Sequence, residues 1–252
     1  MNQVSDFYDD LSEYYHLIFE NWADEREYEA DALDSIIRTK FGNNVHNILD
    51  VTCGIGTQTL GLAQRNYQIS GMDISPKAVE RAKREAHTLK LDIPFQVGDV
   101  RELSSIVNKK YDLVMSCDNS LPHLLSDDEL LKAFVEMRKC IKSSGNCLIT
   151  VRDYDKEPSE GMVFKPYGIR KHSGGDCVIF QVWTFFGRLY DVCWYFIDHD
   201  KDPAKSIVRK FASRFYAVKT ATLVSLMRDA GFKDVERLEK GFFQPVIIGT
   251  NP

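Results

Sequence analysis

The stretch Asp50-Val51-Thr52-Cys53-Gly54-Ile55-Gly56-Thr57 joins a short apolar run, residues 46–51, to a helical pattern over residues 57–65. Glycines at positions 54 and 56 permit a sharp turn and leave room for a ligand to touch the main chain. The stretch therefore predicts a ligand site where a strand passes into a helix.

Asp73 ends the next predicted strand, residues 67–73. Its two carboxylate oxygens can accept the hydroxyl protons of a ribose. Alternatively, Asp73 caps the helix that opens at Ser75-Pro76, a pair with a capping residue followed by proline at the first helical position.

Short β-rich runs alternate with helical patterns as far as residue 155, which is typical of βαβ units around a parallel sheet. Aromatic and β-branched runs over residues 161–216 then predict antiparallel strands, with Gly187-Arg188 as a hairpin turn. The other predicted strands cover residues 95–98, 111–117, 146–152, 233–239 and 243–250. The other predicted helices cover residues 6–19, 25–40, 75–89 and 220–230, with one more capped by Ser126 in a unit that Gly145 closes.

The composition is that of a globular protein: of 252 residues, 44% are hydrophobic and 27% are charged. A net charge of −5 does not favour nucleic acid or an anionic membrane as a partner. The most apolar run, residues 177–186, is too short to span a bilayer, and the acidic N-terminus does not resemble a secretory signal. We therefore expect a cytoplasmic protein. The six cysteines lack metal-site spacing, so we expect no metal.

The glycine turn has two interpretations. A nicotinamide dinucleotide site would have a third glycine at position 59, where this chain has Thr, so pyrophosphate binding is disfavoured. In the second interpretation, the strand acid Asp50 faces a cationic or amino-bearing ligand.

On the second interpretation, residues 50–56 resemble the first motif of the class I S-adenosylmethionine-dependent methyltransferases, although that family often has Gly where this chain has Thr52. Asp73 is similar to the family's ribose-binding acid, Gly98-Asp99-Val100 to its adenine clamp, and residues 111–117 to its fourth strand. The resemblance implies S-adenosylmethionine as the cofactor and S-adenosylhomocysteine as the product. The cofactor-binding residues that it implies are Asp50, Thr52, Cys53, Gly54, Gly56, Asp73, Ile74, Asp99, Val100 and Cys117.

Together these observations predict an α/β, Rossmann-like fold. Its sheet has seven mostly parallel strands with a C-terminal antiparallel hairpin strand, and an antiparallel β cap is inserted after the fifth strand. We expect one methyltransferase domain over residues 1–252. Within it, residues 1–44 form an N-terminal helical lid, residues 45–155 and 217–252 the cofactor-binding core, and residues 156–216 the substrate cap.

A narrower resemblance concerns the acceptor. Residues 117–124 and 151–155 are similar to segments of glycine and sarcosine N-methyltransferases, with Asp118 where those enzymes have glycine. The resemblance implies that Asn119 and Arg152 bind the acceptor's carboxylate. A guanidinium suits that role because it offers a bidentate fork. Alternatively, Arg152 forms a surface ion pair with Asp153 or Asp155.

Three further side chains are candidates near the reacting groups. His123 is either a base for an incoming amine or a structural residue, and the structural role is the more common one for a histidine without a carboxylate partner. Tyr15 and Tyr216 are selected from a group of aromatic residues that could face a sulfonium. That group consists of Tyr15, Trp22, Tyr167, Trp183 and Tyr216.

The sequence thus predicts a methyltransferase that acts on a small molecule, with glycine, sarcosine or another carboxylated amine as the expected acceptor. An O-methyltransferase, a nicotinamide-dependent oxidoreductase and a non-catalytic cofactor-binding module remain as alternatives. We expect no nucleic acid or membrane partner, and either a monomer or a homo-oligomer. Positioning of the nucleophile, rather than a metal or a covalent intermediate, is the expected source of catalysis.

Overall fold

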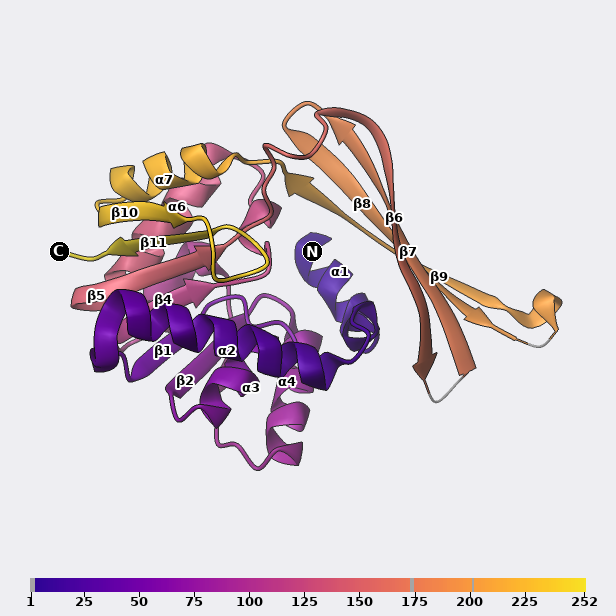
Figure 1. The fold of residues 1–252 in the computed structure, drawn as a ribbon, viewed down its shortest axis with the longest axis horizontal. Coiled ribbons are helices and arrows are strands. Elements are labelled where there is room, and N and C mark those ends of the chain that lie inside the picture. The colour runs from indigo at the N-terminus through magenta and orange to yellow at the C-terminus, as the bar shows by residue number, and fades with distance from the viewer. Residues whose placement is uncertain (1–2, 173–174, 201) are drawn as a thin grey trace.

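The computed structural model describes residues 3–172, 175–200 and 202–252. The first two residues of the predicted N-terminal lid lie outside these ranges. Within the described ranges the chain forms a seven-stranded sheet and a separate four-stranded sheet, with helix α1 between them (Figure 1).

The larger sheet has the strand order β10-β11-β5-β4-β1-β2-β3. Strands β1 to β5 are parallel, whereas β11 runs antiparallel to both β5 and β10. This confirms the predicted mostly parallel sheet with a C-terminal antiparallel hairpin. Its strands are β1 (Asn47–Asp50), β2 (Gln68–Asp73), β3 (Phe95–Val97), β4 (Tyr111–Ser116), β5 (Ile141–Thr150), β10 (Lys233–Leu238) and β11 (Val246–Thr250).

Local sequence explains where the helices around this sheet begin and end. Ser75 caps α4 by accepting a hydrogen bond from Ala78 N, and Ser126 caps α6 in the same way from Glu129 N. Gly231, with φ 94°, follows α7 in the left-handed conformation that ends many helices. The helices are α3 (Thr57–Gln64), α4 (Pro76–Thr88), α5 (Leu103–Ile106), α6 (Asp127–Lys139) and α7 (Thr220–Asp229), with short 3-10 turns η2 (Gly42–Asn44), η3 (Val100–Glu102), η4 (Leu121–His123) and η5 (Pro203–Lys205).

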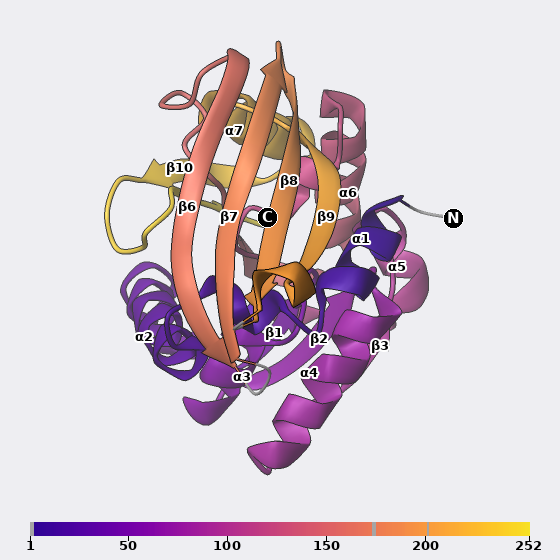
Figure 2. The same ribbon diagram turned by 90° about the vertical axis from the view of Figure 1, so that its right-hand side faces the viewer.

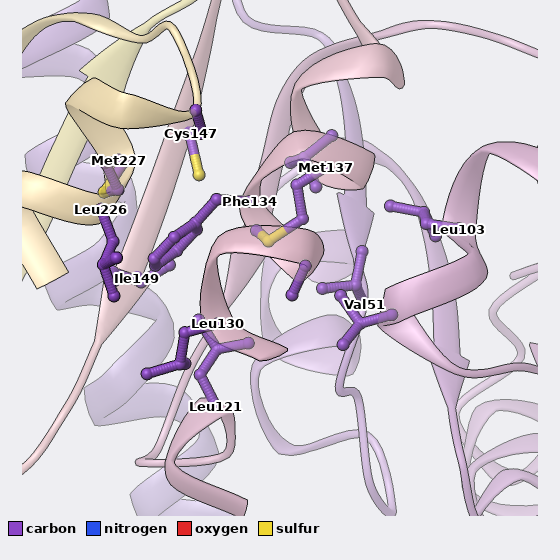
Figure 3. Close-up of a cluster of buried hydrophobic side chains, with 14 of the residues drawn as sticks. Val51, Leu103, Leu121, Leu130, Phe134, Met137, Cys147, Ile149, Leu226 and Met227 are labelled. Carbon is purple, nitrogen blue, oxygen red and sulfur yellow. The ribbon is translucent and has the colours of Figure 1, made fainter. Parts of the chain in front are cut away.

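Alternate residues of each strand point to opposite faces of the larger sheet. Helices cover both faces, so the side chains on each face are buried. On one face, Leu49 and Ile149 pack with α6 and α7, and Figure 3 shows Phe134 among these side chains. On the other face, Ile48 and Leu148 pack with α2 and α3.

The N-terminal segment forms α1 (Gln3–Leu11), η1 (Tyr15–Ile18) and α2 (Trp22–Phe41). The single helix predicted over residues 6–19 is therefore interrupted after Leu11. Here Ser12 Oγ donates back to the Asp9 carbonyl, and Asn21 accepts from Ala23 N to start α2. The interruption lets the segment turn between the two sheets.

The second sheet contains β6 (Glu160–His172), β7 (Gly175–Phe186), β8 (Leu189–His199) and β9 (Ile207–Tyr216) in chain order, all antiparallel. Gly187, with φ 72°, and Arg188 form the predicted turn between β7 and β8. Figure 2 shows the sheet standing over the strand ends of the larger one, and its inner face packs on α1. The predicted antiparallel insertion after the fifth strand is confirmed.

One prediction about the larger sheet is wrong. Gly145 does not close the helical unit before the fifth strand, because β5 already begins at Ile141 and contains it. A Cβ at position 145 would lie 2.9 Å from the Asp112 carbonyl oxygen, so glycine permits two strands to approach closely.

None of the helices in the described ranges has the length and apolarity to cross a bilayer.

Candidate active site

A cavity of about 280 Å³ lies at the carboxyl ends of the parallel strands. We call it the strand-end cavity. Its walls come from the loops after β1, β2, β3 and β4, while α1 contributes Val4 and Tyr8 and the turn after α1 contributes Ser12. The strand order reverses between β1 and β4, which is where open α/β sheets bind ligands.

The glycine turn exposes main chain to the strand-end cavity. Gly54 has φ 52°, and a Cβ added there would meet no atom within 4 Å. Its N–H donates to Asp73 Oδ2 at 2.8 Å. Gly56, with φ 100°, precedes α3 and does not line the cavity, so its role here is to let the chain turn.

Asp50 lies behind the turn rather than facing the strand-end cavity. Its Oδ2 accepts from Thr59 Oγ1 at 2.7 Å and its Oδ1 from Thr52 N at 3.3 Å. Burial raises the pKa of Asp50 to about 7. Thr59, the residue in place of a third glycine, therefore serves to bind this buried acid.

Asp73 lines the strand-end cavity and also organises its floor. Besides Gly54 N–H, its carboxylate accepts from Ser75 N at 2.9 Å. Burial raises its pKa, and these backbone hydrogen bonds oppose the rise. Each oxygen keeps a lone pair for a ligand hydroxyl. The helix cap is Ser75, whose Oγ accepts from Ala78 N, so the alternative in which Asp73 caps α4 is wrong.

At the opposite end of the strand-end cavity, Asp99 is held by its neighbour Arg101. Arg101 Nε donates to both oxygens of Asp99, at 3.0 and 3.1 Å, and its Nη1 binds Glu129. Burial would raise the pKa of Asp99, but the hydrogen bonds from Arg101 outweigh it and lower the pKa. The predicted adenine contact at Asp99 therefore has a guanidinium beside it.

The net charge of the strand-end cavity is negative. Its lining includes four carboxylates, at Asp73, Asp99, Asp118 and Glu129, and one guanidinium, at Arg101. Such a lining favours a cationic ligand and disfavours a pyrophosphate, so it argues against the nicotinamide dinucleotide alternative. Of the ten predicted cofactor-binding residues, Thr52, Cys53, Gly54, Asp73, Ile74, Asp99, Val100 and Cys117 line the cavity, and Asp50 and Gly56 do not.

A second cavity of about 220 Å³, the inter-sheet cavity, lies between the strand ends, the N-terminal segment and the inner face of the four-stranded sheet. Tyr8, Tyr15 and Asp118 line both cavities, which therefore adjoin. Tyr167, Trp183 and Trp194 give the inter-sheet cavity an aromatic wall.

Arg152 brings a positive charge into the inter-sheet cavity. Its Nη1 donates to Tyr190 Oη at 2.9 Å, and its guanidinium carbon lies 4.3 Å from the centroid of the Trp183 ring. No carboxylate of the described residues forms an ion pair with it. A guanidinium that is stacked and held in this way is oriented for an anionic ligand.

The alternative of a surface ion pair for Arg152 is wrong. Asp153 pairs instead with Arg237 and Lys156. Asp155 pairs with Lys219. Both acids have other cations near them, whereas the Arg152 side chain turns inward.

Asn119 and Gln181 add neutral donors beside Arg152. Asn119 Oδ1 accepts from Arg152 N and Tyr154 Oη, each at 3.0 Å. Gln181 Oε1 accepts from Trp183 Nε1 at 2.6 Å. Because both carbonyl oxygens are engaged, each amide nitrogen remains as a donor.

His123 is enclosed. Tyr8 Oη lies 2.8 Å from its Nε2, Ser213 Oγ lies 3.3 Å from its Nδ1, and the Phe215 ring centroid is 3.9 Å away. Burial lowers the pKa of His123 to about 3, so the imidazole is neutral at physiological pH. These contacts favour the structural role, in which His123 positions Tyr8.

The two selected tyrosines lie in different places. Tyr15 Oη donates to Asp118 Oδ2 at 3.0 Å, where both cavities meet. Tyr216 lines neither cavity, because its hydroxyl donates to Asp127 at 2.6 Å and Arg188 lies over its ring. Trp22, another of the aromatic group, lines neither cavity, and its Nε1 donates to Oγ1 of Thr57, which lines the strand-end cavity.

The cysteines at the site are poor nucleophiles in this environment. Burial raises the pKa of both the Cys53 and the Cys117 thiol well above the usual range. Among the described residues there is no group of three or more His, Cys, Asp or Glu side chains that could hold a metal ion.

Sequence reasoning missed Tyr8, Gln181 and the part played by Asp118. Gln181 carried a usable signal, since strand periodicity places it on the inward face with Ile179 and Trp183. Tyr8 had no comparable signal, because only the turn after α1 brings it to the strand ends.

Comparison with known proteins agrees with this geometry. Residues 48–145 match a family model described as a methyltransferase domain. The matched range begins in β1 and contains the glycine turn and strands β2 to β4, so this part of the chain is similar to the domains of class I S-adenosylmethionine-dependent methyltransferases. Over 136 residues it is 25% identical to the glycine/sarcosine N-methyltransferase of Parasynechococcus marenigrum (strain WH8102), a match that covers 54% of this chain and 47% of that protein. The chain spans about half the length of the first curated relatives that it matches.

Solved structures share the fold of this chain. Streptomyces venezuelae DesVI matches with a TM-score of 0.75 at 19% identity, over 96% of this chain and 98% of that one. SAM-bound CalS10, an amino pentose methyltransferase from Micromonospora echinaspora, matches with a TM-score of 0.73 at 16% identity, over 89% of this chain and 92% of that one.

The residues of the strand-end cavity fit S-adenosylmethionine, the cofactor of this class. The exposed main chain at Gly54 admits a ligand closely, Asp73 offers acceptors for a diol, and the acidic lining suits a sulfonium. The strand-end cavity, whose lining fits the cofactor, adjoins the inter-sheet cavity.

Proposed function

We propose that this protein transfers a methyl group from S-adenosylmethionine to a small acceptor that carries a carboxylate and an amine. The observation that carries the proposal is the Arg152 guanidinium, which lies in the inter-sheet cavity and forms no ion pair with the described carboxylates. Because the inter-sheet cavity adjoins the strand-end cavity, an acceptor there would lie next to the cofactor.

Arg152, Asn119 and Gln181 would bind the acceptor's carboxylate. The guanidinium supplies charge, and the two amide nitrogens supply further donors. The narrow resemblance to glycine and sarcosine N-methyltransferases supports the same assignment for Asn119 and Arg152. A charged hydrogen bond of this kind contributes about 1.5–3 kcal/mol to binding.

S-adenosylmethionine supplies an electrophilic methyl group on a sulfonium. The protein's own residues then have to align the nucleophile and exclude water, and orientation can lower a barrier by roughly 7–11 kcal/mol. The aromatic wall excludes water from the inter-sheet cavity. Tyr15 donates its hydroxyl proton to Asp118, so the Tyr15 oxygen is left to accept an N–H group of the methyl acceptor.

The test is methyl transfer from labelled S-adenosylmethionine to glycine, sarcosine, other small amino acids and their hydroxy-acid analogues. We expect transfer to a carboxylated amine, and an Arg152→Gln variant should have a KM raised about tenfold or more with unchanged affinity for S-adenosylhomocysteine.

Arg214→Gln is a matched control, because this exposed arginine pairs with Asp191 and lines neither cavity. Transfer to hydroxy acids alone would select the O-methyltransferase alternative. If Arg152→Gln does not change KM for any acceptor that is methylated, the carboxylate assignment is wrong.

A further inference from the structure

Asp118 stands where the two cavities meet. Of the three residues that line both, Tyr8 and Tyr15 have hydroxyl groups and only Asp118 has a carboxylate. It occupies the position at which the glycine and sarcosine N-methyltransferase stretch has glycine. Glycine at this position in the related stretch means that the loop after β4 can form without a side chain there. The carboxylate of Asp118 is therefore not needed for the loop itself.

The carboxylate of Asp118 is held in place by neutral donors. Tyr15 Oη donates to Oδ2 and Gln244 Nε2 donates to Oδ1, each at 3.0 Å. The main chain is held too, because Asp118 N–H donates to Thr150 Oγ1 at 2.8 Å in a left-handed conformation with φ 52°. Within the described ranges no lysine, arginine or histidine forms an ion pair with Asp118.

Two further acids on α2 lie near Asp118. Glu25 lines the inter-sheet cavity, and burial followed by the charge of Asp118 raises its pKa. Glu29 is buried, and its Oε1 has no hydrogen-bond partner among the residues that the structure describes. A cationic group in the cavity would relieve the repulsion among these carboxylates.

The inter-sheet cavity therefore has two poles. Arg152 is its basic pole, and Asp118 with Glu25 is its acidic pole, which lies on the side of the strand-end cavity. An acceptor with its carboxylate at Arg152 would have its other polar group at Asp118.

We propose that Asp118 is the specificity-determining residue that selects an amine over a hydroxyl acceptor, by binding the acceptor's nitrogen in its ammonium form where the cavities meet. The assignment rests on the proposed function. An ammonium group gains a charge-assisted hydrogen bond to Asp118 that a neutral hydroxyl does not. The N–H bond that points to the Asp118 carboxylate orients the acceptor's nitrogen. The ammonium group then loses one proton to solvent, which frees the nitrogen's lone pair for the methyl group.

The test compares ligands that differ only in the group facing Asp118. Dissociation constants for glycine and glycolate, and for ethylamine and ethanol, are measured by NMR titration of the protein saturated with S-adenosylhomocysteine. Wild-type protein should prefer each amine. In Asp118→Asn that preference should fall about tenfold or more, as expected for one lost charged hydrogen bond.

Asp118→Gly is the second variant, because glycine adopts a positive φ without strain and removes the carboxylate alone. Asp128→Asn is the matched control: it makes the same change of charge on an exposed residue in the first turn of α6. The control should keep the wild-type preference, and melting temperatures confirm that each variant is folded.

Two outcomes overturn the assignment: an amine preference that survives in both Asp118 variants, or a wild-type protein that binds no amine or prefers the hydroxyl. Failure of the proposed function looks different. If Arg152→Gln binds glycine and glycolate as well as wild type, while Asp118→Asn still loses its preference for ethylamine over ethanol, the carboxylate assignment fails and the role of Asp118 stands.

Discussion

Replacing Asp73 by Asn tests the cofactor site most directly. The carboxylate accepts the N–H groups of Gly54 at 2.8 Å and Ser75 at 2.9 Å, and it lines the strand-end cavity. An Asn side chain has one acceptor oxygen and an NH2 group that can only donate. One of the two main-chain N–H groups therefore loses its partner and faces this NH2 group.

The magnitude follows from the number of charged hydrogen bonds that are lost. Loss of one charged hydrogen bond to a ribose hydroxyl costs about 1.5–3 kcal/mol of binding free energy, which weakens cofactor binding about 10- to 150-fold. Loss of one to the main chain destabilises the fold by a similar amount. Removal of a charge that is costly to bury, shown by the raised pKa of Asp73, offsets part of that destabilisation.

The assay is calorimetric titration of S-adenosylhomocysteine into the Asp73→Asn and Asp50→Asn proteins, with thermal unfolding measured in parallel. Asp50→Asn is the control because Asp50 supports the same turn from behind and does not line the cavity. We expect the control to bind within about threefold of wild type, which is less than the loss of one hydrogen bond would cause. Wild-type affinity in folded Asp73→Asn, or equal weakening in both variants, would refute the assignment of Asp73 to the ribose.

Two other predictions concern His123 and Gly61. Because burial lowers the pKa of His123 to about 3, its imidazole NMR signals should not titrate between about pH 5 and 8, and a midpoint in that range would contradict the enclosed role. The unfolded chain binds this proton more readily, so the protein should lose stability as pH falls from the ordinary histidine pKa of 6.5 toward 3, and His123→Phe should lessen that loss in acid-unfolding curves. Gly61→Ala places a Cβ 2.6 Å from Ala30 Cβ and 2.8 Å from the Arg26 carbonyl oxygen. The substitution should therefore lower the free energy of unfolding, measured by urea titration, by about 1–3 kcal/mol. An unchanged free energy of unfolding would mean that α2 and α3 separate without cost.

Much of the fold could be predicted because its signals are local. The turn at Gly54 and Gly56, the caps at Ser75 and Ser126, and the end of α7 at Gly231 each depend on residues within a few positions of one another. The errors also have local causes. Gly145 is a usual helix terminator, but here the close approach of Asp112 on the neighbouring strand requires a glycine inside β5.

The candidate site was predictable where its residues follow the ends of parallel strands. Thr52, Asp73, Asp99 and Cys117 converge on the strand-end cavity because those ends share one edge of the sheet. Asp50 follows the same rule, but its place in the structure depends on Thr59 Oγ1, which draws the carboxylate away from the cavity. Tyr216 is aromatic and is the last residue of the cap, yet its hydroxyl binds Asp127 outside both cavities.

By itself the sequence determined the α/β class, the cofactor turn and the residues at the ends of the parallel strands, because these depend on spacing along the chain. Only the tertiary structure decided the inter-sheet cavity, which is the proposed acceptor site. It brings Tyr8 from α1, Asp118 from the loop after β4, Arg152 from the end of β5 and Gln181 from β7 around one cavity. Contacts between elements so distant in the chain arise from the docking of one sheet on another through α1, and no local pattern encodes that docking.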